Sequence, residues 1–156
     1  MDDYRDAIAS CCRQLRLSAN LADNAFAIEG ETHQEYLYNL LSKEIKCRKA
    51  ARIGKLINSA GFPVQHNFAA FHPDEVQFPS GVTPESLKAL EFFHAGNNLV
   101  MYGSTGTGKT MLSICIGMEA CRSGIPVKFF RTASLINQLS EAQERGSLAQ
   151  LHKKLD

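Results

Sequence analysis

Three glycines are crowded into eight residues, GSTGTGKT, which run from Gly103 to Thr110. The apolar run LVMY precedes them, and a segment with helical periodicity, MLSICIGMEACR, follows. Glycine tolerates backbone conformations that other residues avoid, so such a stretch can turn its amides inward around an anion. The following helix would direct its positive end toward the same point. The pattern GxxxxGK[ST], between a strand and a helix, therefore predicts a phosphate-binding loop.

Within this loop, Lys109 is expected to supply a positive charge to the β and γ phosphates of a nucleotide, and Thr110 a hydroxyl to Mg²⁺. The expected ligands are therefore a nucleoside triphosphate and Mg²⁺, with Thr110 as the metal-binding residue. A glycine-rich turn with a chance Lys-Thr pair is the alternative, and the flanking strand and helix patterns argue against it. The expected nucleotide-binding residues are Gly103, Ser104, Thr105, Gly106, Thr107, Gly108, Lys109 and Thr110.

The pattern around the loop predicts the fold class. Leu99–Tyr102 and Pro126–Arg131 are apolar enough for buried strands, and helices are expected after each of them. This alternation, with the phosphate-binding loop inside it, predicts an α/β fold of the P-loop NTPase type with a parallel sheet, preceded by an all-α N-terminal region. The predicted parts are residues 1–61, helical and binding DNA or a partner; residues 62–82, a linker; and residues 83–156, a partial ATP-binding domain.

The N-terminal region contains one long helix with a clear start and stop. Thr32 and Glu35 form a capping-box pattern, and Gly61 followed by Pro63 ends the helical periodicity, so a helix is expected over 33–59. Residues 35–60 carry six basic and two acidic side chains, although the net charge of the whole chain is only +1. Such a run of charge could follow a nucleic-acid backbone, or it could be a solvated helix face. The candidate nucleic-acid-binding residues are Lys46, Arg48, Lys49, Arg52 and Lys55.

Other classes of protein are disfavoured. The apolar runs are shorter than the roughly 18 residues that a membrane span needs, and the acidic start MDDYRD does not resemble a signal peptide. The five cysteines include no CxxC pair, so neither a disulfide framework nor a zinc ribbon is expected. A metal site built from Cys47, His66 and His72 is possible on paper, but buried thiols and surface imidazoles are the simpler interpretation. A cytoplasmic protein without a membrane partner is expected.

Longer stretches of the sequence resemble one family. Its features here are a basic helix ending in KLINSAGFP, an aromatic linker FHPDEVQFPSGVTPESLKALEFF, and the segment NNLVMYGSTGTGKTMLSICIGMEACRSGIPVKFFRTASLINQLSEA. In these the chain resembles the IstB-like ATP-binding proteins, AAA+ ATPases that assist certain insertion-sequence transposases and are similar to DnaC-type helicase loaders. The resemblance covers nearly the whole chain and is sharpest from Asn98 to Leu139. It implies ATP binding at Gly103–Thr110 and, as partners, DNA, a transposase and further copies of the chain assembled on DNA.

The resemblance also implies what completes such a site. In the family, an apolar strand ending in Asp-Glu follows a Lys-rich helix like LHKKLD, and it supplies the Mg²⁺ ligand and the base for the attacking water. Because this sequence ends at Asp156, we expect it to bind nucleotide without hydrolysing it. In the family's sheet, two later strands separate the two predicted strands. Unpaired apolar edges and a marginal, aggregation-prone domain are therefore expected.

Three alternatives remain at this stage. One is an ATPase of the helicase-loader type, which would share the fold and differ in its partner. Another is a DNA- or protein-binding module whose nucleotide site is vestigial, in which the basic helix matters and ATP does not. A small-molecule kinase is disfavoured, because no acceptor site or arginine-bearing lid follows the loop.

Overall fold

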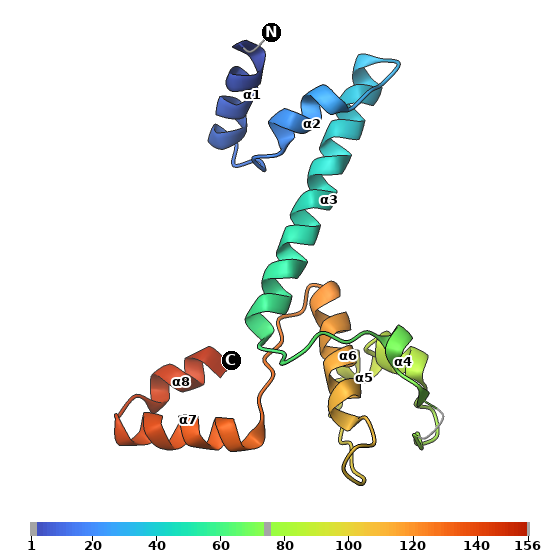
Figure 1. The fold of residues 1–156 in the computed structure, drawn as a ribbon, viewed down its shortest axis with the longest axis vertical. Helices are drawn as coiled ribbons and strands as arrows, with labels where there is room; N and C mark the ends of the chain where they lie inside the picture. The colour runs from blue at the N-terminus through green and yellow to red at the C-terminus, as the bar shows by residue number, and fades with distance from the viewer. Residues whose placement is uncertain (1–2, 74–75, 156) are drawn as a thin grey trace. The chain divides into compact units, whose positions relative to one another are not determined.

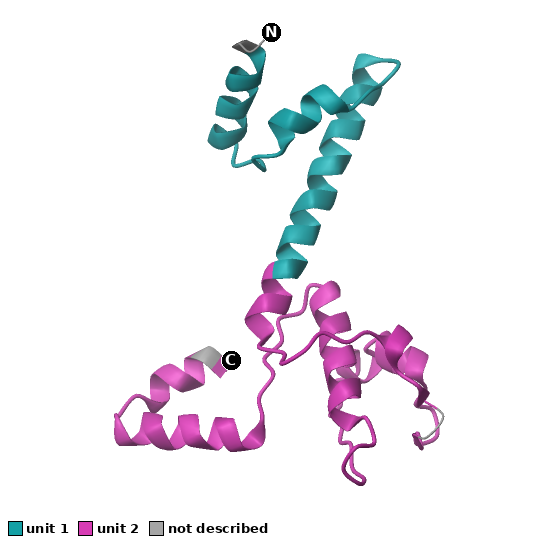
Figure 2. Cartoon of the chain, viewed as in Figure 1, with its two compact units in different colours: residues 1–54 teal, residues 55–156 magenta. Residues whose placement is uncertain are grey.

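The computed structural model describes residues 3–73 and 76–155, and within them every regular element is helical (Figure 1). The chain divides into two compact units, Met1–Gly54 and Lys55–Asp156 (Figure 2). The division falls inside a long helix, while the linker predicted over 62–82 lies within the second unit. The predicted three-part division stays a prediction. The elements are α1 (Asp3–Gln14), α2 (Leu21–Ala27), α3 (His33–Ala60), the 3-10 turn η1 (Phe68–Ala70), α4 (Pro84–Lys88), α5 (Glu91–His94), α6 (Lys109–Arg122), α7 (Thr132–Glu144) and α8 (Leu148–Leu155).

The first unit contains α1, α2 and most of α3. Its buried side chains include Cys12 from α1 and Leu21 and Ala22 from the start of α2. The α3 helix begins as the sequence predicts, because the amide of Glu35 donates to Thr32 Oγ1 over 3.1 Å. The Glu35 carboxylate accepts from the Glu31 amide at 2.9 Å, one residue earlier than a complete capping box requires.

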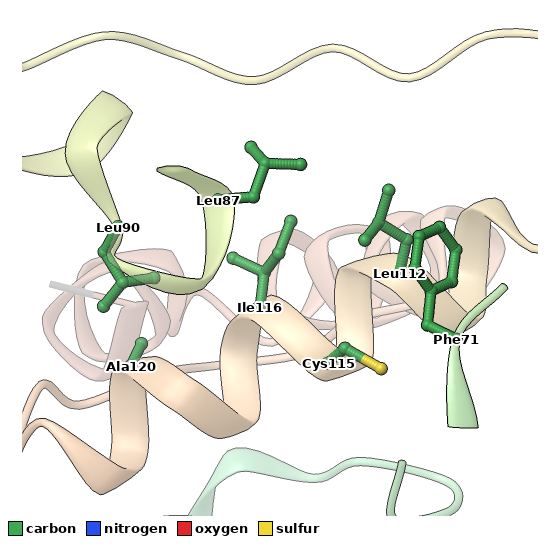
Figure 3. Close-up of a cluster of buried hydrophobic side chains, with 7 residues drawn as sticks. All are labelled: Phe71, Leu87, Leu90, Leu112, Cys115, Ile116 and Ala120. Carbon is green, nitrogen blue, oxygen red and sulfur yellow. The ribbon is translucent and has the colours of Figure 1, made fainter. Parts of the chain in front are cut away.

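The second unit is built around α6. One face of this helix buries Leu112, Cys115, Ile116 and Ala120 against residues from earlier in the chain, namely Phe71, Leu87 and Leu90 (Figure 3). Eight of the residues of α6 are buried, which explains why the sequence here is apolar on almost every side. This cluster is the hydrophobic core on which the glycine-rich loop is mounted.

Two short helices, α4 and α5, precede the glycine-rich loop. Thr83 caps α4, accepting from the Ser86 amide at 3.1 Å, with Pro84 at the first helical position. Leu90 then adopts a left-handed conformation, with φ of 59°, and separates α4 from α5. The side chain of Leu90 is only 2% exposed, so its burial in the core compensates for the unfavourable backbone conformation.

The predicted parallel sheet is wrong. Neither Leu99–Tyr102 nor Pro126–Arg131 forms a strand, and no strand occurs in residues 3–73 and 76–155. Leu99 and Met101 contact the core, whereas Val100 and Tyr102 are 80% and 93% exposed, so the apolar run is covered on one side only. A strand requires a partner for its backbone groups, and an apolar run by itself does not supply one.

The second of these segments finds its contacts at the end of α3. The Phe129 amide donates to the carbonyl of Ala60 at 2.8 Å, and Lys128 Nζ donates to the carbonyl of Ser59 at 3.0 Å. The rings of Phe62 and Phe129 lie 5.9 Å apart. The segment is therefore held by a helix end and an aromatic pair, and the expected unpaired sheet edges do not arise because the described residues form no sheet.

Candidate nucleotide site and basic helix

The glycine-rich loop has the backbone conformation that its sequence predicts. Gly103, Gly106 and Gly108 have φ angles of 139°, 88° and 80°, all in a region that L-residues with a side chain rarely adopt. A Cβ added at Gly106 would meet no atom within 4 Å. The glycines are therefore required by backbone conformation, and the space around Gly106 is open to a ligand.

The loop leads directly into α6, whose cap is Gly108. This residue provides no side-chain hydrogen bond to the helix start. The first amides of an α-helix have no partner within the helix, and a glycine cap leaves them free to bind an anion. Thr110, in the first turn of α6, is exposed. The loop and the first turn of α6 thus form a cradle of amides with a hydroxyl at its edge.

Lys109 is turned back onto the loop. Its Nζ donates to the carbonyls of Gly103 at 2.9 Å and Ser104 at 2.6 Å, and to Thr107 Oγ1 at 3.2 Å. The Thr107 hydroxyl in turn donates to the Ser104 carbonyl at 2.9 Å. The ammonium group is therefore held at the centre of the loop by oxygen atoms, the kind of atom that a phosphate would offer.

A cavity of about 490 Å³ adjoins the loop. One side is made by loop residues Gly103, Thr107, Gly108 and Lys109, and no acidic side chain is present among the described residues that line it. The other sides come from the linker, from the segment before the loop, and from one leucine each of α4 and α6. They are Phe71, Val76, Gln77, Phe78, Pro79, Val82, Leu87, Leu99, Val100, Met101, Tyr102 and Leu112. The cavity is polar at the loop and largely apolar elsewhere, which suits a ligand with an anionic end and a flat, apolar end.

Residues of the linker form part of this cavity. Phe71 is buried, and its ring lies 3.9 Å from where a Cβ of Gly108 would be. Phe78 and Gln77 line the same cavity. The sequence pointed to Gln77 and Phe78 as adenine contacts only through their position just ahead of the nucleotide-binding domain, and to Phe71 only through the spacing of aromatic side chains in the linker.

The cysteines of α6 are structural. Cys115 and Cys121 are fully buried, and desolvation raises the pKa of both thiols, so they stay protonated and unreactive at neutral pH. Within the described residues, no group of three His, Cys, Asp or Glu side chains could hold a metal ion. No described helix has both the length and the apolar character needed to cross a membrane.

The basic stretch of α3 is divided by the structure. Lys46, Lys49 and Arg52 are exposed in the first unit, whereas Lys55 is exposed in the second. Arg48 is different because its guanidinium is engaged within the first unit. Its Nε donates to Glu44 Oε1 at 2.7 Å, and its Nη2 donates to the carbonyl of Arg16.

Glu44 is the centre of a buried polar network. It is only 3% exposed and accepts from the Ser18 amide at 2.8 Å, from the Ser18 hydroxyl and from Arg48. Desolvation is the largest single influence on its pKa and raises it. The hydrogen bonds from Ser18 and the charge of Arg48 together outweigh that influence, so the pKa of Glu44 lies below its ordinary value. The network joins the turn after α1 to the middle of α3.

Comparison with known proteins identifies the family. The family model described as "IstB-like ATP binding protein" matches residues 14–155. A protein of Geobacillus stearothermophilus, whose name refers to insertion sequence IS5376 and to ATP binding, is 31% identical over 150 residues. That match covers 92% of this chain and 59% of the relative.

Two further relatives carry similar names. One, from Mycobacterium tuberculosis, is 28% identical over 86% of this chain and 55% of its own length. Another, from Bacteroides fragilis and named as IS21-like, is 22% identical over 99% of this chain and 61% of its own length. The chain therefore spans little more than half the length of these relatives. Because the family model covers most of the chain, the glycine-rich loop and the basic helix belong to a member of the IstB-like ATP-binding protein family.

Proposed function

We propose that this chain binds ATP with Mg²⁺ through Gly103–Thr110 and acts as an ATP-binding helper in DNA transposition. The observation that supports this most strongly is the loop itself. Three left-handed glycines, an ammonium group at their centre and a helix start meet beside a cavity, in a chain of the IstB-like family. The names of the relatives refer to both insertion sequences and ATP binding.

The residues present fit a nucleotide. The loop amides and the first turn of α6 would hold the phosphates, and Lys109 would exchange the oxygen atoms of Gly103 and Ser104 for phosphate oxygens. The adenine base of the nucleotide would enter the apolar part of the cavity, beside Phe78. Thr110 would offer one oxygen ligand to Mg²⁺, and phosphate and water oxygens would supply the others.

We further propose that this chain by itself holds nucleotide without hydrolysing it. Hydrolysis requires a carboxylate beside the γ-phosphate to orient the attacking water. Of the described acidic residues after the loop, Glu119 pairs with Arg122 at 2.6 Å and Glu141 with Arg145 at 3.5 Å. Neither of them, nor Glu144 of α7, lines the cavity.

The partners follow from the basic stretch and the family. The exposed cations Lys46, Lys49 and Arg52 of the first unit would contact DNA phosphates, and Lys55, in the second unit, is a separate candidate contact. A transposase and further copies of the chain are the proposed protein partners. This proposal is by analogy with relatives whose names refer to insertion sequences. A role in loading a helicase would use the same site with a different partner, and capture by purified transposase or replicative helicase distinguishes the two.

The test is ATP binding by the full chain in the presence of Mg²⁺, with phosphate release followed in the same sample. Lys109→Ala should weaken binding about tenfold or more, because a charge-assisted hydrogen bond contributes roughly 1.5–3 kcal/mol. Lys88→Ala removes an equal charge from α4, outside the cavity, and should leave binding unchanged. Equal affinity of the wild type and Lys109→Ala for ATP would refute the nucleotide site at this loop. Phosphate release that depends on Lys109 would refute the proposal that the chain does not hydrolyse ATP.

A further inference from the structure

The turn after α1 contains an arginine where the backbone favours glycine. Leu17 N–H donates to the Cys12 carbonyl at 2.8 Å, and Arg16 N–H donates to the Arg13 carbonyl at 3.2 Å. These two bonds define a Schellman helix end, in which the residue after the cap is left-handed and is usually glycine. Here that residue is Arg16, with φ of 53°.

Only one other non-glycine residue in the described chain has a positive φ, and it has a structural reason. Leu90 buries its side chain in the core and is 2% exposed. The Arg16 side chain is exposed, and among residues 3–73 and 76–155 it makes neither an ion pair nor a hydrogen bond. Packing therefore explains the leucine but not the choice of arginine, whose exposed guanidinium is available to a ligand.

The position of Arg16 suggests what it binds. Its carbonyl accepts from Arg48 Nη2, and two residues later Ser18 donates to Glu44, so the turn is fixed against the middle of α3. Arg48 is in the stretch that also presents the exposed cations Lys49 and Arg52. A third exposed cation, from a different segment of the same unit, is thus held beside this stretch.

We propose that Arg16 contacts a DNA phosphate and extends the basic surface of α3 onto the turn between α1 and α2, with Arg48 as the residue that positions it. This rests on the proposed DNA-binding role of α3. Two of the donors of Arg48 hold Glu44 and the Arg16 carbonyl, so its main effect on DNA binding acts through the turn. Arg16 offers its whole guanidinium to the ligand.

The experiment uses the full chain and a fluorescein-labelled 30-base-pair duplex of mixed sequence, titrated at several salt concentrations. Each phosphate contact contributes about 0.9 to the slope of log K against log salt concentration, so Arg16→Gly should make that slope less steep by about 1. Arg52→Ala should do the same. Lys43→Ala is the matched control and should leave the salt slope unchanged. Nine residues at 100° each place Lys43 on the opposite side of α3 from Arg52.

Arg16→Gly should not destabilise the protein, because glycine is the residue that this turn prefers. Weaker DNA binding by this variant would therefore not be a consequence of unfolding. The variant should unfold at the wild-type temperature or above it while binding DNA less tightly. An unchanged salt slope, or a lower unfolding temperature that accounts for the weaker binding, would overturn the proposal. Absence of DNA binding by the wild type would instead refute the DNA-binding role of α3, and the assignment of Arg16 with it.

The positioning role of Arg48 has its own readout. In a background that already carries Arg48→Ala, the turn is no longer tied to α3, so adding Arg16→Gly should change the salt slope far less than it does in the wild type. This lack of additivity separates positioning from an independent contact. Additive effects of the two substitutions on the salt slope would show that Arg48 does not position Arg16.

Discussion

Each of the two compact units is stabilised internally by a different kind of interaction. In the second unit, an apolar cluster around α6 includes Phe71, Leu87 and Leu112, and the glycine-rich loop stands on it. In the first unit, few side chains are buried, and one of them is the charged Glu44, which accepts hydrogen bonds from Ser18 and Arg48. The units should therefore respond differently to mutation and to pH.

The largest expected effect is in the apolar cluster. Leu87→Ala should destabilise the second unit by about 2–5 kcal/mol, because the side chain is 2% exposed and its removal leaves a cavity. Urea unfolding monitored through the nucleotide-binding unit would measure this. Leu37→Ala in α3 is the matched control, since that leucine is 53% exposed, and its effect should stay within about 0.5 kcal/mol. Equal losses of stability in Leu87→Ala and Leu37→Ala would show that the buried cluster contributes no more to stability than an exposed position does.

A smaller effect is expected in the polar network. Glu44→Ala removes the acceptor of Ser18 and Arg48 and should cost about 1–3 kcal/mol. The loss should be local, so the measurement is hydrogen exchange at the Ser18 amide, which should become faster while the amides of α6 stay protected. Glu29→Ala, at an exposed position, should leave both unchanged. If α6 were to lose protection as well, the two units would not be independent in stability.

The smallest expected effect is a pH dependence confined to the first unit. The pKa of Glu44 is lower in the folded state than its ordinary value of 4.5, so its charged form stabilises the fold. That contribution is complete above the unfolded value and is lost as the pH falls through the lowered folded pKa. Acid titration of Ser18 amide protection should show this loss in the wild type but not in Glu44→Gln. Identical titrations of both proteins would show that Glu44 is not the responsible group.

Sequence patterns predicted the long helices and the loop well, because the relevant signals are local. The Thr32 cap and the Gly61 stop defined α3 to within about a residue, and the start of α6 at Lys109 follows from the loop itself. The glycines at 103, 106 and 108 were predicted from the backbone conformation that an anion-binding loop requires, and they adopt it.

What the sequence did not predict depends on partners far along the chain. The sheet was inferred from apolar runs, but Val100 and Tyr102 are exposed and no described segment pairs with them. Arg48 was grouped with Arg52 because both lie in the same basic stretch, although the partners of Arg48 include the Arg16 carbonyl, 32 residues away. An acidic residue within a basic stretch, Glu44, was the one local sign of a buried network.

The most direct test is to measure the binding of two ligands, nucleotide and DNA, to two variants of the chain. Lys109→Ala and Arg52→Ala would each be titrated with ATP and Mg²⁺, and separately with duplex DNA in the absence of nucleotide. Lys109→Ala should lose ATP binding and keep DNA binding, whereas Arg52→Ala should keep ATP binding and show a shallower salt slope for DNA. A folded Lys109→Ala variant that keeps ATP binding, or an Arg52→Ala variant that loses it, would contradict the assignment of nucleotide to the loop and DNA to α3.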